Sequence, residues 1–204
     1  MDLVVVATAF ALIFPVELPD KTFVATLVLA TRYRPVPVWA GVSAAFFVQS
    51  LVAVTAGGLL SLLPHPVVSA AAGLLFLVGA VILWRGAADA DADVEESEEE
   101  AEVVALAAAD VTWLRAAATS FGVLFLAEWG DLSQLLTAGL AARYHDPLSV
   151  FVGSWLALVV VAALAVVLGR TLMRFVRLST IRRVGAGICV LLAGVAVYDL
   201  VTAL

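Results

Sequence analysis

The sequence predicts an all-α polytopic membrane protein with six transmembrane helices, arranged as two inverted repeats of three helices each. Two observations predict the membrane class. Of the 204 residues, 64% are hydrophobic and 14% are charged, whereas a soluble domain is about half apolar and about a quarter charged. The length also suits six helices of about 20 to 25 residues plus one linker. A third observation, a motif that occurs twice, predicts the repeats.

The repeated motif places Glu-x-x-Asp, followed two residues later by a hydroxyl side chain, inside a long apolar segment. The copies read Glu17-Leu18-Pro19-Asp20-Lys21-Thr22 and Glu128-Trp129-Gly130-Asp131-Leu132-Ser133. The alignment continues without a gap to Arg32-Tyr33 and Arg143-Tyr144. Two more apolar segments follow each copy, so each repeat has three helices. Three is an odd number, and the second repeat must therefore enter the membrane from the opposite side.

The first repeat covers residues 1–85 and begins with a predicted helix over 3–31. Pro15 and Pro19 remove backbone donors within this helix, so we expect it to kink or open at the motif. The second helix is predicted over 38–62, with Gln49 near its centre, where we expect an interhelical hydrogen bond. A turn that contains two prolines precedes the third helix, predicted over 67–84.

Residues 86–111 form the predicted linker between the repeats. Nine acidic residues lie between positions 89 and 102, with almost no aromatic residue among them. Such a run repels itself and stays solvated. The second repeat covers residues 112–204, with helices predicted over 113–142, which carries the second motif, and over 148–168 and 181–200.

Basic residues predict the orientation. With six helices, nine of the ten arginines fall on one side of the membrane and only Arg143 falls on the other. The positive-inside rule therefore places both termini outside and the acidic linker in the cytoplasm. The chain uses ten arginines and one lysine, Lys21. This bias is typical of GC-rich bacterial genomes, so the expected location is a bacterial plasma membrane.

The two motifs predict one site near the middle of the membrane. Residues three apart share one face of a helix, so Glu17 can point with Asp20, and Glu128 with Asp131. Inverted symmetry then brings the two faces together. A carboxylate at membrane depth costs on the order of 2.5–3.5 kcal/mol, which indicates a functional role. Neutral oxygens to complete a metal site could come from Thr22, Ser133 and Gln134.

The predicted ligand set indicates the substrate and the mechanism. Oxygen ligands without His or Cys suit magnesium, calcium or manganese(II). Four ionised carboxylates exceed the charge of one divalent ion by two units, so some are expected to hold protons when the ion is absent. Cation binding would then expel protons. The expected transported species are a divalent cation and protons, with the lipid bilayer as surroundings and no permanently bound cofactor.

Other classes fit the sequence less well. An intramembrane aspartyl protease could use Asp20 and Asp131, but the paired glutamates and hydroxyls would be surplus to such a dyad. Another membrane-embedded hydrolase, acting on lipid phosphates, should need arginines near the acids, and the motifs have none. Nucleic acid is not an expected partner, because no basic patch lies outside short helix-end clusters. The sequence carries no signal for the oligomeric state.

The doubled motif resembles that of a small cation/proton exchanger family related to the Golgi manganese transporter, within the calcium/cation antiporter group. That family carries Glu-x-Gly-Asp-Lys/Arg-Ser/Thr twice. Here Pro19 replaces the glycine of the first copy, and Leu132 replaces the basic residue of the second. The resemblance implies a transporter and not an enzyme. It further implies export of manganese(II), and of calcium second, from the cytoplasm in exchange for protons.

Overall fold

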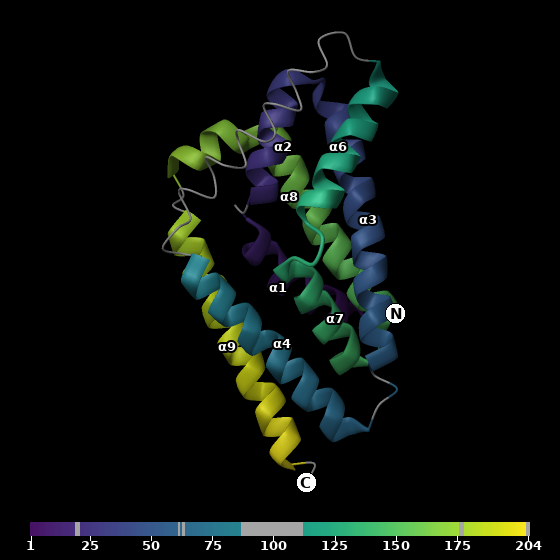
Figure 1. Ribbon diagram of the computed structural model, residues 1–204, viewed down its shortest axis with the longest axis vertical. Helices are drawn as coiled ribbons and strands as arrows, with labels where there is room; N and C mark the ends of the chain where they lie inside the picture. Colours follow the sequence, from purple (N-terminus) through teal and green to yellow (C-terminus); the bar gives the residue numbers. More distant parts are fainter. Residues whose placement is uncertain (19–20, 61, 63, 87–111, 176–177, 203–204) are drawn as a thin grey trace.

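The computed structural model of the protein describes residues 1–18, 21–60, 62, 64–86, 112–175 and 178–202, and every regular element in them is a helix (Figure 1). The predicted all-α class is therefore confirmed for the described residues. The helices are α1 (Leu3–Glu17), α2 (Lys21–Arg32), α3 (Pro35–Leu60), α4 (His65–Gly86), α6 (Trp113–Ala127), α7 (Leu132–Tyr144), α8 (Pro147–Phe175) and α9 (Leu178–Thr202).

Two of these helices are long and apolar enough to cross a membrane alone, namely α3 and the stretch Pro147–Val167 of α8. The bent pair α1 and α2 makes a third span if it is counted as one. Shorter apolar stretches occur in α4, α6 and α9. These spans support a membrane protein, whereas the six-helix inverted repeat stays a prediction. The predicted linker lies almost entirely outside the described residues.

Both helices that carry the motif are broken in the structure. The predicted helix over 3–31 consists of α1 and α2, whose axes differ by 72°, as the expected kink required. Pro15 lies inside α1 and not at the break. We expected one continuous helix over 113–142, and this was wrong, because α6 ends at Ala127 and α7 begins at Leu132. Gly130 explains the second break, since its φ of 81° is left-handed and is readily adopted only by glycine.

The helix that we predicted over 148–168 is also longer than expected. α8 continues to Phe175, and α9 begins at Leu178. Arg170 and Arg174, which follow the predicted end of this helix, therefore lie within α8. The helix continues beyond the end of the apolar pattern, because arginine is a good helix former.

The first helix of each half packs on the middle helix of the other half. α1 lies against α8, and α3 lies against α6 (Figure 1). In both pairs a glycine allows the backbones to touch: Gly153 faces the Val6 carbonyl, and Gly41 faces the Ala117 carbonyl. Each half also has a pair of stacked phenylalanine rings in its first helix, Phe10–Phe14 in one and Phe121–Phe125 in the other. The ring centroids are 5.4 Å apart in both pairs.

Two tryptophans join α3 to α8. The indole of Trp155 donates to the Ser43 carbonyl at 3.1 Å, and that of Trp39 donates to the Val159 carbonyl at 3.2 Å. Earlier positions of α3 thus meet later positions of α8, so the two helices run antiparallel. Antiparallel packing is what an inverted repeat requires of its two middle helices.

The helices α4 and α9 form a closely packed pair beside this core (Figure 1). The pair contacts the core mainly through α7, where the buried ring of Phe76 lies against Gly139. A smaller contact joins α1 to α9.

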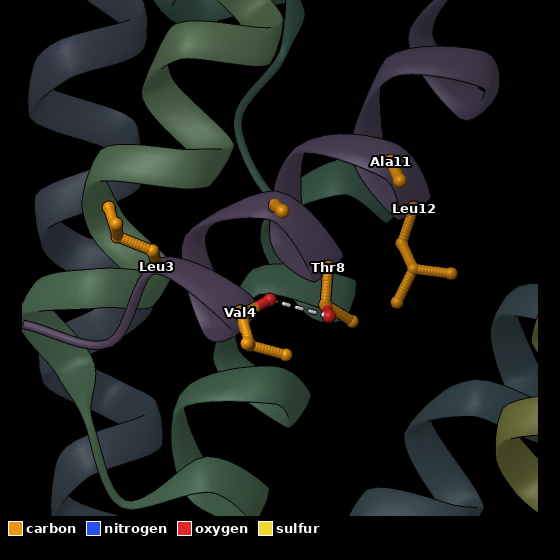
Figure 2. A pocket seen from close by; sticks show the side chains of 6 residues that line it. Leu3, Val4, Thr8, Ala11 and Leu12 are labelled. Atoms are coloured by element: carbon orange, nitrogen blue, oxygen red, sulfur yellow. Dashed lines mark hydrogen bonds between the residues drawn. The ribbon is translucent and has the colours of Figure 1, made fainter.

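An apolar recess of about 500 Å³ lies on the outer face of α1 (Figure 2). Its walls include Leu3, Val4, Leu12 and Thr8. The Thr8 hydroxyl donates to the Val4 carbonyl at 2.7 Å (Figure 2), so its polarity is satisfied within the helix. None of the residues lining the recess is ionisable. This surface suits lipid and does not suit a cation.

Asp146 caps the start of α8. Its Oδ1 accepts from the Ser149 N–H at 3.1 Å, and its Oδ2 accepts from the Ser149 hydroxyl. These hydrogen bonds hold the pKa of Asp146 below its ordinary value of 3.8. The charged cap therefore stabilises the fold above pH 3.8 and is lost as the pH falls through the lowered pKa.

Asp146→Ala should lower the melting temperature in detergent by about 2 to 4 °C, because α8 loses its N-cap. Asp146→Asn keeps an acceptor oxygen but loses the charge, so it should melt between the alanine variant and the wild type. The melting temperatures can be measured by intrinsic tryptophan fluorescence. Equal melting of the alanine variant and the wild type would contradict the capping role.

Candidate cation site

Three carboxylates converge between the two broken helices. Single carboxylate oxygens of Glu17, Glu128 and Asp131 all lie within 4.8 Å of one another. Glu17 and Glu128 are buried, with 1% and 2% of their surface exposed, and Asp131 is half-buried. Among the residues that the structure describes, no other group of three acidic, His or Cys side chains comes this close. Like charges at this separation repel one another, and a bound cation or a proton relieves that repulsion.

The helix breaks bring the three carboxylates together. Glu17 is the last residue of α1, Glu128 directly follows α6, and Asp131 directly precedes α7. The Glu128 N–H still donates to the Leu124 carbonyl at 3.1 Å, so α6 fixes its backbone. The carboxyl ends of helices carry partial negative charge, which favours a nearby cation. We expected Glu128 and Asp131 to meet on one helical face, and this was wrong, because a turn joins them.

The hydroxyl residues of the motifs lie beside these acids. The buried Thr22 hydroxyl donates to Oε1 of Glu17 at 2.9 Å and so orients that carboxylate. Ser133 is buried two residues after Asp131. Its backbone carbonyl accepts from the Thr137 hydroxyl at 2.7 Å.

Gln134 spans the turn between α6 and α7. Its amide nitrogen donates to the Glu128 carbonyl at 2.7 Å, and its amide oxygen accepts from the Gly130 N–H at 3.3 Å. Both ends of the side-chain amide are therefore engaged in holding the turn. This position also keeps Gln134 close to the cluster for which we predicted it.

Asp20 lies outside the described residues, as does the side chain of Lys21. The structure therefore brings together three of the four predicted carboxylates and leaves the fourth a prediction.

Two features near the site were missed by sequence reasoning. Thr26 and Thr137 are both buried and stand 111 residues apart, the spacing of the motif copies, so the ungapped alignment could have found them. The second feature is the set of partners of Gln49. The expected interhelical hydrogen bond is confirmed, since its amide nitrogen donates to the carbonyls of Phe125 at 3.2 Å and Leu124 at 3.4 Å. That these carbonyls lie at the end of α6, beside Glu128, could not be read from the sequence.

Comparison with known proteins identifies the family. The sequence profile described as "Divalent cation/proton antiporter GDT1" matches residues 5–91 and 116–203. The chain belongs to the GDT1 family. The resemblance to exchangers related to the Golgi manganese transporter is thereby confirmed. The GDT1 family is one of antiporters and not of enzymes, so the protease and hydrolase alternatives have no support.

Relatives in the GDT1 family come from plants and cyanobacteria. The chain is 31% identical to "Protein PAM71, chloroplastic" of Arabidopsis thaliana, over 96% of this chain and 57% of that protein. It is 29% identical to "GDT1-like protein 1, chloroplastic" of Oryza sativa subsp. indica, over 96% of this chain and 62% of that protein. It is 30% identical to "GDT1-like protein sll0615" of Synechocystis, over 83% and 84% of the two chains. The chain thus spans less than two thirds of the chloroplast relatives. No solved structure matches it.

Proposed function

We propose that the protein is a secondary active transporter that exports a divalent cation from the cytoplasm in exchange for protons. The observation that carries this proposal is the convergence of Glu17, Glu128 and Asp131 at two helix breaks inside an apolar fold. Membership of the GDT1 family supports it independently. We assign these three acids, together with Asp20, as the groups that hold the cation.

Charge explains why a cation and protons would compete for this site. Three carboxylates carry one negative charge more than a divalent cation neutralises, and four carry two more. In an apolar setting the excess charge must be relieved, and protons relieve it. An arriving cation displaces protons, and returning protons displace the cation. Exchange follows because the site is poorly stable when both are absent.

The neighbouring groups have supporting roles in this proposal. Thr22 and Ser133 supply neutral oxygens, directly or through water, and Thr22 also orients Glu17. Gln134 holds the turn that carries Glu128 and Asp131. An all-oxygen site suits hard or borderline ions. We place manganese first and calcium second, following the family resemblance.

The proposed architecture is two inverted three-helix repeats, residues 1–85 and 112–204, joined by an acidic cytoplasmic linker at 86–111. The matched close approaches at Gly41 and Gly153 support it, as does the antiparallel packing of α3 on α8. Both termini would lie outside a bacterial plasma membrane, as the distribution of arginines predicts.

Transport by purified protein in liposomes tests this function. With an acidic interior, we expect manganese uptake that raises the internal pH, weaker uptake of calcium, and little uptake of magnesium. Collapse of the pH gradient with an ionophore should abolish the driven uptake. Uptake without any change of internal pH would overturn proton coupling. Uptake no greater than in protein-free liposomes would overturn transport.

A further inference from the structure

The break after α6 leaves a backbone carbonyl without its helical partner. In a continuous helix, the Phe125 carbonyl would accept from the N–H of Trp129. Here the Trp129 N–H turns back to the Leu126 carbonyl at 3.5 Å. Gln49 of α3 takes the vacated place, since its amide nitrogen lies 3.2 Å from the Phe125 oxygen. A half-buried carbonyl without a donor would be costly, so this hydrogen bond stabilises the broken end.

The same amide reaches the carbonyl that anchors Glu128. The Leu124 oxygen accepts from Gln49 at 3.4 Å and from the Glu128 N–H at 3.1 Å. One backbone oxygen therefore connects Gln49 to the residue that presents a carboxylate to the site. Gln49 is 2% exposed, so solvent does not compete for its amide.

The packing of α3 fixes the position of Gln49. Eight residues before Gln49, Gly41 touches the α6 backbone at Ala117. Eight residues after it, Gly57 touches the α7 backbone at Ala138. The amide is thus held between two close approaches, one to each helix that flanks the break. A side chain held in this way can define where the end of α6 lies.

The other half of the protein has no equivalent amide. Gly41 and Gly153 are 112 residues apart. By the same spacing, the residue of α8 that is equivalent to Gln49 is Val161. Val161 is buried and packs with Phe23 and Ala165. At the end of α1, the Thr22 hydroxyl instead donates a hydrogen bond directly to the Glu17 carboxylate.

We propose that Gln49 is a positioning residue that sets the cation affinity of the site by fixing the end of α6 and, through it, Glu128. This inference rests on the proposed function. Groups that orient a ligand through one further hydrogen bond typically contribute about 10- to 100-fold to metal affinity. Because Gln49 acts through the backbone, we expect the lower end of that range. Affinity should fall while the turnover at saturating cation stays close to normal.

The test compares Gln49→Met, which has a similar length and no donor, with the wild type. Two manganese concentrations are measured for each protein. One is the concentration that gives half-maximal exchange, and the other is the concentration that gives half-maximal thermal stabilisation in detergent. Both should rise about 10-fold in the variant, with maximal exchange changed less than about twofold. Thr55→Val is the matched control, since this exposed α3 hydroxyl donates to the Leu51 carbonyl of its own helix, and it should leave both concentrations unchanged.

Two results would overturn the positioning role. Unchanged concentrations in Gln49→Met would show that the amide does not influence the site. Reduced maximal exchange with unchanged concentrations would show a purely structural role, because loss of folded protein lowers the rate and not the affinity. Failure of the proposed function gives a different result, namely manganese stabilisation of the wild type without proton exchange. In that case the stabilisation midpoints still decide the role of Gln49.

Discussion

Glu128→Gln should strongly weaken cation/proton exchange by lowering the affinity for the cation. The amide has nearly the shape of the carboxylate, so the fold should persist while one negative charge is lost. At a separation of about 4 Å and an effective dielectric constant of about 20, one pair of unit charges interacts by about 4 kcal/mol. Allowing for partial compensation, cation affinity should fall by about 100- to 1,000-fold. The concentration of manganese for half-maximal exchange in liposomes provides the measurement.

The same loss is expected for Glu17→Gln, because Glu17 is equally buried and lies in the same cluster. Asp146→Asn is the matched control, since it makes the same change from acid to amide at the start of α8, away from the cluster. This control should exchange normally. Near-normal manganese affinity in either glutamine variant, at equal amounts of folded protein, would remove that residue from the site.

Gly57→Ala should destabilise the protein by about 1 to 3 kcal/mol, the usual cost of overpacking a tight interface. An added Cβ would overlap the backbone carbonyl oxygen of Ala138 in α7 and crowd the Cβ of Ala141. Neither partner is a flexible side-chain end, so α3 and α7 must separate. Since α7 begins directly after Asp131, exchange should fall together with the melting temperature.

The adjacent residue provides the control for this prediction. A Cβ on Gly58 meets no described atom within 4 Å, and alanine is the better helix former. Gly58→Ala should therefore melt at or slightly above the wild-type temperature. Fluorescence-detected size-exclusion chromatography after heating measures both variants. Equal melting of the two variants would show that α3 and α7 do not touch at Gly57.

The helical membrane class and the convergence of acids from the two motif copies were predictable from the sequence for one physical reason. Charged groups are expensive in an apolar segment, so Glu17, Glu128 and Asp131 stood out against their surroundings. The break in the proline-containing copy was also predictable, because proline has no N–H to donate to the helical hydrogen bonds. The structure confirms that the first motif interrupts a helix and that acids from both copies lie together.

The second break and its supports were not predictable. A single glycine in an apolar helix is common, and only the left-handed φ of Gly130 shows that the chain turns there. The role of Gln49 depends on the Phe125 carbonyl, which is available to accept its hydrogen bond only because the helix stops. Gln134 was predicted as a ligand from its place in the motif, and nothing in the sequence indicated that its amide also spans the turn. Hydrogen bonds to irregular backbone leave no periodic pattern in a sequence.

The paired packing of α3 on α6 and of α8 on α1 has an evolutionary consequence. In the inverted-repeat architecture that we propose, this pairing is the arrangement of a two-fold symmetric dimer contained in one polypeptide. In a dimer of identical half-length chains, any substitution would change both interfaces together. Fusion into one chain removes that constraint, so each half can diverge alone. Gln49 and Val161 differ in the way that such freedom permits, since an amide bonds the helix end in one half while hydrocarbon packing fills the equivalent place in the other.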